Sequence, residues 1–393
     1  MANTILTPSM ITRKALMILH QKLNFVGSIK RDYDDSFAKR GAKIGDTLRI
    51  RLPNQYTVRT GQALSTQDTT EQQTNLTVAT QNAVDTTFSS AELTMSLDDF
   101  AERILDPAMS VLASNIEADA MSMYKDVYQQ VNGQGAPSTF AKVLQGGKIL
   151  TDALSPYSER RLNLNTQDNM DMVNDLKGLF NAQDKLSSNY REGRLAGPFS
   201  GFSDIYENTL WPSHTRGAGA GYIVNGASQT GSTLTVSTGT GAINQGDVFT
   251  IAGVFRVHPE TKLSTGVLQQ FVVTSAATSG ATSIAISPAI IPTGALQNVT
   301  ASPATSAAIT FAGTASTASG ISMAYHKDAF TFATADLVMP EGVDFSAREV
   351  FDGISMRIVR QYAINSDTMP CRIDVLYGYK AIRPQLACRL ANN

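Results

Sequence analysis

The residues of this chain that could carry out chemistry are few and widely spaced. The four histidines lack the H-x-x-x-H or H-E-x-x-H spacing that places two imidazoles on one helix face. They are His20, His214, His258 and His326. No G-x-S-x-G stretch offers a serine nucleophile. The acid pairs Asp34-Asp35 and Asp98-Asp99 are explained by helix capping and solvation. We therefore predict no catalytic, cofactor-binding or metal-binding residues, and no enzyme activity.

Three other conspicuous residue groups also have structural explanations. Gly146-Gly147-Lys148 is the nearest match to a phosphate-binding loop, but Ile149 follows the lysine and the upstream glycine is misplaced, so we predict a turn. Trp211 is expected to be a packed anchor. The only cysteines, Cys371 and Cys388, lack C-x-x-C spacing, which indicates two small core residues in a reducing compartment.

Composition excludes several classes of protein. The 393 residues are 42% hydrophobic, which is typical of a soluble protein with two or three domains. A net charge of −2 argues against a surface devoted to nucleic acid. No apolar run is long enough for a signal peptide or a membrane span, so we expect no membrane association.

The stretch Ser96–Val131 predicts a long helix around which the other elements are arranged. Apolar residues recur there at steps of three and four, and Ser96 with Asp99 resembles a capping start. At about 1.5 Å per residue, this spine helix would be about 50 Å long. Pro107 either kinks it or begins a second helix after Asp106.

Upstream of the spine, the sequence predicts one short helix and one long hairpin. Apolar residues from Ile11 to Leu23 follow a helix start at Thr7 and Pro8. From Asp46 to Met95, an alternating run at Leu48, Ile50 and Leu52 is followed by about 20 polar residues and a second extended run. Two strands alone are marginally stable in water, so this hairpin is expected to dock on another subunit.

Charge is distributed unevenly over this part of the chain. Residues 1–60 hold eleven basic and four acidic side chains, whereas residues 61–130 hold eleven acidic and two basic ones. Complementary packing between copies would explain this division, and simple solvation is the alternative. The predicted intersubunit contacts join basic hairpin residues to acidic spine residues. They are Arg49, Arg51 and Arg59 with Glu102, Asp106 and Glu117.

The second half of the chain changes to strand patterns. Thr166 is expected to cap a helix that includes Met172 and Leu176. Residues 222–325 are rich in Gly, Ser, Thr and Ala, and their short apolar runs predict a small barrel or sandwich inserted into a host domain. After it, alternating residues from Met356 and from Cys371 predict a hairpin that closes on the spine helix.

Several long strings in the chain resemble the major coat proteins of short-tailed phages related to Salmonella phage P22. These strings are GDVFTIAGVFRVHPETKLSTGVLQQFVVT (246–274), ISPAII (286–291), AYHKDAFTFATADLVMP (324–340), DGISMRIVRQY (352–362) and CRIDVLYGYKAIRPQLACR (371–389). The opening, through Pro53, is similar to the amino-terminal arm of that family.

The resemblance implies an α+β chain with the Hong Kong 97 capsid fold. It would comprise an amino-terminal arm (1–45), an extended hairpin loop (46–95), a peripheral domain on the spine helix (96–135), the first part of an axial domain (136–220), an inserted β-barrel (221–325), and a return through the axial domain to carboxy-terminal strands (326–393). By position, Arg256–Ser264 would form a loop between capsomers, with Arg256, His258, Glu260 and Lys262 as its charged or titratable members. Residues 263–325 hold no charge, so contacts there must be apolar or hydrogen-bonded.

The same resemblance implies a major capsid protein without cofactors. Copies would form hexamers and pentamers of an icosahedral procapsid around a scaffolding protein, with a portal protein at one vertex. Assembly would take place in the host cytoplasm, and the shell would expand as double-stranded DNA is packaged. A nearly neutral protein suits a container that does not grip its DNA. The alternatives are a Gly/Ser/Thr-rich adhesin or fibre protein and, with least support, a hydrolase.

Overall fold

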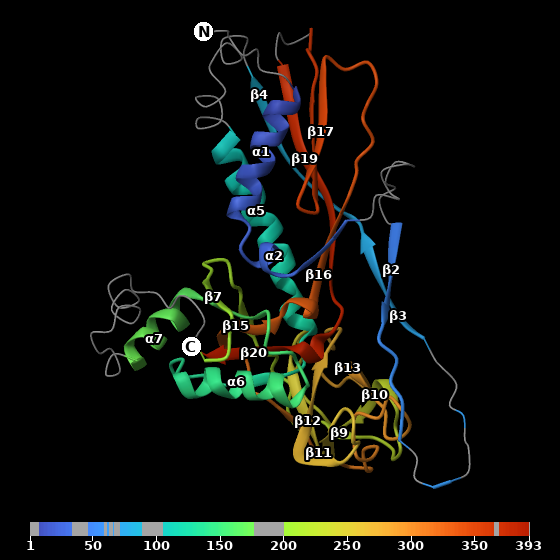
Figure 1. The fold of residues 1–393 in the computed structure, drawn as a ribbon. Coiled ribbons are helices and arrows are strands. Elements are labelled where there is room, and N and C mark those ends of the chain that lie inside the picture. Colours follow the sequence, from blue (N-terminus) through green and yellow to red (C-terminus); the bar gives the residue numbers. More distant parts are fainter. Residues whose placement is uncertain are drawn as a thin grey trace. The chain divides into compact units, whose positions relative to one another are not determined.

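The computed structural model describes residues 8–33, 46–58, 61–62, 66, 71–88, 105–176, 200–364 and 369–392. The chain divides into two compact units, and each is discontinuous in sequence. Unit 1 comprises Met1–Ile50, Gln73–Met121 and Phe330–Lys380. Unit 2 comprises Arg51–Gln72, Ser122–Ala329 and Ala381–Asn393. Helices and strands are mixed in both units (Figure 1).

Unit 1 is built on a six-stranded sheet with the order β1-β16-β19-β18-β17, in which β4 also pairs with β19. The strands are β1 (Lys30–Tyr33), β4 (Thr80–Phe88), β16 (Phe330–Ala335), β17 (Phe345–Phe351), β18 (Ile354–Arg360) and β19 (Met369–Ala381). The predicted carboxy-terminal hairpin is confirmed, because β18 and β19 are antiparallel with Arg357 opposite Asp374. Cys371 is buried on this hairpin, as predicted.

Two helices and a short turn of helix cover this sheet. The predicted amino-terminal helix is confirmed as α1 (Pro8–Lys22), whose buried face includes Ile11, Ala15 and Leu19. It packs on β17 and β18, and α5 (Asp106–Met121) packs on α1 and β4 (Figure 1). The short α2 (Phe25–Ser28) also contacts α5, and the Phe25 ring meets Phe330 edge-on at 5.6 Å.

The spine helix is shorter at its carboxyl end than predicted. α5 ends at Met121 and is followed by the 3-10 helix η3 (Ser122–Asp126). Val131 lies in β5 (Gln130–Asn132), where it pairs with Leu390 of β20. Its position agrees with the helical spacing of apolar residues, but pairing in the sheet of unit 2 makes it part of a strand. Pro107 is the second residue of α5, and Leu105 directly before this helix has a π-helical conformation. Residues 96–104 lie outside the described ranges.

The long hairpin also differs from its prediction. Its first strand, β2 (Asp46–Leu52), pairs with β3 (Gln72–Val78), which lies within the stretch predicted to be a polar loop. The predicted second strand, around Val84, is β4, and it pairs with β19 of the same chain. Leu76 and Val78 on β3 are buried with Ala333 and Leu376, which explains the pairing. Half of the segment is therefore integrated into unit 1.

Unit 2 contains a second mixed sheet with the order β5-β20-β15-β6-β7, in which β8 also pairs with β15. Its strands are β5, β6 (Arg160–Leu164), β7 (Asp204–Glu207), β8 (Ser213–Thr215), β15 (Ala318–His326) and β20 (Ala387–Asn392). Cys388 is buried on β20, and Trp211 is buried with its Nε1 donating to Asn163 Oδ1 at 2.8 Å. Both residues are therefore core residues, as predicted.

The helices that cover this sheet correct two predictions. Gly146-Gly147-Lys148 lies inside α6 (Phe140–Asp152) and is not a turn. A β-carbon on Gly146 would lie 3.2 Å from Leu390 Cδ2, so the glycine permits close packing of the helix on the sheet. α7 (Thr166–Leu176) is capped by Asn165, whose Oδ1 accepts the Asp168 amide at 2.6 Å, and not by Thr166.

The Gly/Ser/Thr-rich region forms a closed antiparallel barrel, shown in yellow to orange in Figure 1. The strand order is β14-β11-β12-β13-β10-β9, and a bridge between Ile223 and Ala308 closes the sheet. The strands are β9 (Ile223–Val224), β10 (Gly231–Ser237), β11 (Val248–Val257), β12 (Ser264–Val273), β13 (Ser283–Ile290) and β14 (Ile309–Phe311). The short apolar runs that predicted this region fall on strands β10, β11, β12 and β13. Phe249 packs between Phe271 and Phe311 in the core, with ring separations of 5.7 and 5.6 Å.

Candidate functional site

The basic side chains predicted to join subunits lie on the exposed face of the β2–β3 hairpin. Alternation along β2 turns Leu48 and Ile50 toward buried residues of unit 1 and leaves Arg49 and Arg51 exposed. Arg51 Nη1 lies 3.6 Å from Glu71 Oε1, and both side chains are exposed. Such a pair adds little stability, so Arg51 stays available to another chain. Arg59 lies outside the described residues.

The acidic candidates on the spine helix differ in accessibility. Asp106 is half exposed at the start of α5, where its carboxylate lies 3.0 Å from Lys22 Nζ. Glu117 is 1% exposed and accepts the backbone amides of Phe25 at 3.1 Å and Val26 at 3.3 Å. Burial raises the pKa of Glu117 to about 8, although these amides oppose the shift. Glu117 therefore joins two parts of its own chain and is not accessible to a neighbour, contrary to the prediction. Glu102 lies outside the described residues.

The predicted loop between capsomers is the turn between β11 and β12. Its shape is fixed from within, because the His258 amide donates to Leu263 O at 2.9 Å and the Lys262 amide donates to His258 O at 3.0 Å. His258 Nδ1 also accepts the amides of Glu260 and Thr261 at 3.3 and 3.2 Å. Three of the four predicted residues thus belong to one compact turn, and Arg256 lies at its base on β11.

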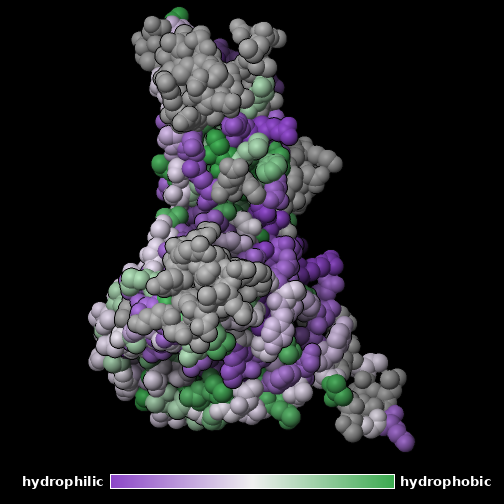
Figure 2. All heavy atoms as spheres, turned by 60° about the vertical axis from the view of Figure 1, so that its left-hand side comes forward, coloured by the Kyte–Doolittle hydropathy of each residue, from purple (hydrophilic) through white to green (hydrophobic). Residues whose placement is uncertain are grey.

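The surface of this hairpin is apolar as well as charged. Leu263 is 70% exposed and Val267 is 59% exposed, whereas the barrel core beneath them is fully covered. On the face shown in Figure 2, hydrophobic residues form several separate patches among hydrophilic ones. An apolar hairpin end of this kind is suited to contact with another protein surface.

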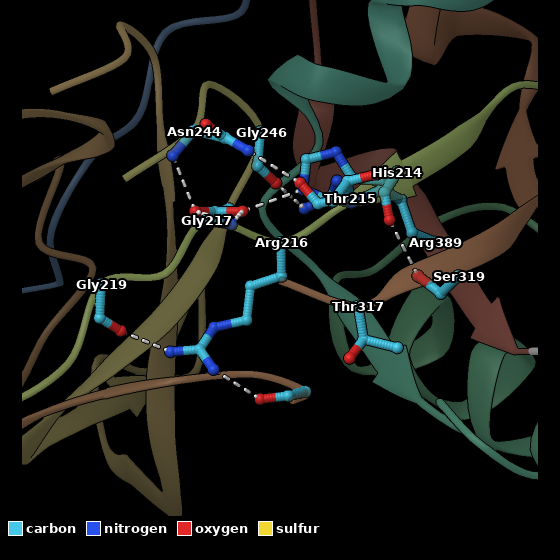
Figure 3. Close-up of polar contacts among 12 residues, drawn as sticks. His214, Thr215, Arg216, Gly217, Gly219, Asn244, Gly246, Thr317, Ser319 and Arg389 are labelled. Carbon is cyan, nitrogen blue, oxygen red and sulfur yellow. Dashed lines mark hydrogen bonds and ion pairs between the residues drawn. The ribbon is translucent and has the colours of Figure 1, made fainter. Parts of the chain in front are cut away.

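A buried polar cluster joins the barrel to the sheet of unit 2 (Figure 3). Asp247, at the start of β11, accepts the amides of Gly217 at 3.0 Å and Asn244 at 2.8 Å. Its other oxygen lies 3.0 Å from His214 Nε2 on β8, and His214 Nδ1 is 3.3 Å from the Tyr124 hydroxyl. One carboxylate thus holds together the chain entering the barrel, a turn of the barrel and the host sheet.

Two arginines complete this junction. Arg389 on β20 is fully buried, and its Nη2 donates to Gly246 O at 2.8 Å. Burial lowers the pKa of Arg389 to about 10. Arg216 donates to Gly219 O at 2.6 Å and to Gly313 O at 2.9 Å, so it ties together the two chain segments that connect the barrel to the sheet (Figure 3). The barrel and the host sheet each have an apolar core of their own.

Sequence analysis did not identify this junction. One signal was available, because Asp247 is the only acidic residue between Glu207 and Glu260. A lone carboxylate in a charge-poor region must be exposed or must have several donors. Its donors are two backbone amides and a histidine more than 30 residues away in sequence, so they could be recognised only in the folded chain.

Two further searches cover the described part of the chain. No group of three or more His, Cys, Asp or Glu residues there is arranged to hold a metal ion. No helix there has the length and hydropathy needed to cross a membrane.

A hairpin with exposed arginines, a preformed turn with exposed apolar residues beside it and a barrel attached by a polar junction are features of a structural subunit that contacts other protein chains. Comparison with known families identifies which kind of structural subunit this is. The profile of the family described as "P22 coat protein - gene protein 5" matches residues 39–389. The chain therefore belongs to the P22 coat protein family, and it is a major capsid protein of a tailed double-stranded DNA phage.

Comparisons with individual proteins gave the following matches. No curated protein matches the chain. A solved structure from Mycobacterium phage Che8 is 12% identical, with 94% of this chain and 90% of that chain covered and a TM-score of 0.45. The mature capsid of bacteriophage PhiM1 is 12% identical, with 94% and 87% covered and a TM-score of 0.44. The CUS-3 coat protein I-domain is 34% identical over 25% of this chain and 97% of that chain, with a TM-score of 0.19.

Proposed function

We propose that copies of this capsid protein assemble in the host cytoplasm into hexamers and pentamers of an icosahedral procapsid. A scaffolding protein would direct assembly, a portal protein would occupy one vertex, and the shell would expand as double-stranded DNA is packaged. Membership of the coat protein family supports this proposal. Each subunit of such a shell makes several contacts, so individually weak interfaces suffice.

The observation that carries the proposal is the β2–β3 hairpin. Its two strands form a separate two-stranded sheet, and its arginines have no strong partner within the described part of the chain. The apolar side of this hairpin is covered by unit 1 of its own chain, where Leu76 and Val78 are buried with Leu376, so its arginines face away from that contact. Contact with a neighbouring copy would neutralise their charge.

Within this proposal, Arg49, Arg51 and Arg59 of one copy meet acidic residues on the spine of the next. Asp106 is the best-supported partner because its carboxylate is half exposed at the amino-terminal end of α5. Glu102 stays a candidate from the sequence. Glu117 is left out because its carboxylate is buried and bonded within its own chain.

Charge reversal tests this pairing. Arg49→Glu combined with Arg51→Glu should reduce the yield of shells at least about tenfold, because like charges would then face each other across the interface. Lys327→Glu is the matched control, since Lys327 forms an exposed pair with Glu159 inside its own chain. The yield of shells is measured by sedimentation and electron microscopy. Reversed arginines that assemble as well as the control would disprove the pairing.

The turn Arg256–Ser264 is proposed as a second contact, between capsomers. Because Leu263 and Val267 are exposed beside it, the contact would be apolar at the hairpin and charged only at the turn. This proposal agrees with the absence of charged residues from 263 to 325.

A further inference from the structure

Two neighbouring cavities lie at the base of the β11–β12 turn in unit 2. The first has a volume of about 370 Å³, and the second about 320 Å³. Tyr128, Arg256 and Gln269 line both, so the cavities share a wall. Each could take in one or two side chains of another molecule.

The charge around the first cavity is entirely positive. Arg256, Lys262 and Arg383 line it, and none of its described lining residues is Asp or Glu. The guanidinium groups of Arg256 and Arg383 make no hydrogen bond or ion pair within the described chain. Lys262 Nζ has only a long bond of 3.4 Å to Gln297 O, and burial lowers the pKa of this lysine. Three half-buried cations thus converge without a counter-ion.

The second cavity adds a buried polar group that is incompletely bonded. Gln129 lines it, is 2% exposed and interacts with the Tyr128 hydroxyl, but neither its side-chain oxygen nor its nitrogen has a partner at normal hydrogen-bond distance and angle. Unbonded buried amides are rare, because the hydrogen bonds that they make with water in the unfolded chain are lost without replacement. The one acid in this cavity, Asp152, is already paired with Lys148 at 2.7 Å. A ligand with acceptor oxygens could accept hydrogen bonds from Gln129 Nε2 and from the Arg256 guanidinium, which both line this cavity.

We propose that these cavities bind carboxylate side chains from a second copy of this chain. This inference rests on the proposed shell function and adds a specific interface to it. Guanidinium groups bind carboxylates through two parallel hydrogen bonds, which suits Arg256 and Arg383 as paired donors. The same chain supplies carboxylates, since residues 61–130 hold eleven acidic side chains and two basic ones, and of these Glu71 is exposed and Asp106 half exposed, each in a single ion pair.

The walls of the cavities favour protein over nucleic acid. Prolines and apolar side chains surround the cations, and several amide side chains could pair with a peptide backbone. The apolar residues include Val257, Pro288, Ile291, Leu296 and Leu386. Duplex DNA carries its phosphates on a convex surface, so proteins usually reach them with protruding basic side chains and not with recessed ones. A side chain from an extended or helical segment can enter such a recess.

Zero-length cross-linking tests the inference on the intact protein. A carbodiimide joins a carboxylate to a lysine amine as an amide, and the elements of water pass to the reagent. In shells assembled from equal amounts of ¹⁴N- and ¹⁵N-labelled protein, Lys262 should become linked to Asp or Glu of a different copy. The neighbouring pair Lys148–Asp152, at 2.7 Å within one chain, serves as the internal control.

Alanine variants show whether the cavity positions that carboxylate. Arg256→Ala with Arg383→Ala should lower cross-linking of Lys262 between copies at least about tenfold and leave the Lys148–Asp152 link unchanged. The midpoint of thermal unfolding should shift little, because neither guanidinium group has a hydrogen bond or ion pair within the described chain. A 24-base-pair DNA duplex should bind the unmodified protein and the double variant equally weakly.

The inference would be overturned if Lys262 formed no cross-link between copies, either in shells or in concentrated protein. It would also be overturned if this cross-link formed equally well in the Arg256→Ala, Arg383→Ala variant, or if binding of the DNA duplex decreased in that variant. Failure to form shells would instead contradict the proposed function, so the two outcomes can be told apart.

Discussion

At the scale of single residues, two ion pairs of β19 show how burial changes the contribution of an ion pair to stability. Arg357 binds Asp374 through two bonds of 3.0 and 2.5 Å, and the Asp374 carboxylate is fully buried. Gln81 Nε2 donates to the same carboxylate at 2.7 Å. Arg372 binds Asp85 at 2.7 and 3.0 Å, but both of these side chains are more than half exposed.

Removal of each arginine should therefore have very different costs. Arg357→Ala leaves a buried charge without its cation and should destabilise unit 1 by about 3–5 kcal/mol. Arg372→Ala loses an exposed pair and should cost about 0–1 kcal/mol. Urea unfolding of the two variants measures the difference. Equal decreases in the free energy of unfolding would show that burial does not determine how much the Arg357–Asp374 pair contributes to stability.

Glu117 should make the stability of unit 1 depend on pH. Burial raises the pKa of its carboxyl to about 8, well above the value of about 4.3 in an unfolded chain. The folded state therefore holds this proton more tightly, so the corresponding stability is present below about pH 4 and is lost as the pH rises through about 8. Between these limits the slope approaches about 1.4 kcal/mol per pH unit.

A variant that cannot titrate tests this assignment. Glu117→Gln should flatten the decrease in unfolding free energy between pH 5 and pH 8.5, whatever its effect on absolute stability. Glu260→Gln, at an exposed position of the β11–β12 turn, should keep the wild-type slope. A Glu117→Gln protein with the wild-type slope would show that another group is responsible.

At the scale of elements, the junction between barrel and sheet should loosen without loss of the barrel. Asp247→Ala removes the acceptor of the Gly217 and Asn244 amides and leaves His214 Nε2 without its partner. Hydrogen exchange at these two amides should become at least about tenfold faster, whereas the amides around Phe249 and Phe271 should stay protected. Unchanged exchange at Gly217 and Asn244 would contradict the role given to Asp247.

The same scale shows what could be predicted from the sequence. Local periodicity was sufficient for α1, for the β18–β19 hairpin and for four strands of the barrel, because each repeats its apolar residues at its own period. The end of α5 could not be predicted this way. Val131 fits the helical period, but the pairing of β5 with β20 determines its conformation.

Two other errors have the same physical origin. The polar sequence of β3 indicates a loop, yet Leu76 and Val78 are buried by residues more than 250 positions later. The Gly146-Gly147 pair indicates a turn, yet Gly146 lies in a helix packed closely on Leu390. Among the candidate site residues, Arg49 and Arg51 were correctly expected on an exposed strand face. Glu117 was not expected inside the chain, because its partners are backbone amides that carry no sequence signature.

At the scale of the whole molecule, the account rests on incomplete surfaces that a second copy would complete. The exposed arginines of the β2–β3 hairpin, the exposed Leu263 and Val267 beside the β11–β12 turn and the cation-lined cavities are such surfaces. Head-to-tail contacts between subunits form a closed ring when the rotation from one subunit to the next adds up to a full turn. Weak contacts of several kinds, repeated over many copies, then give a stable shell.

Electron microscopy of the purified protein, with and without a scaffolding protein, tests this claim most directly. The account predicts closed shells of uniform size, built from rings of five and six subunits, in which the β2–β3 hairpin of one copy contacts the spine helix of another. A protein that stays a solitary monomer under all assembly conditions would contradict it.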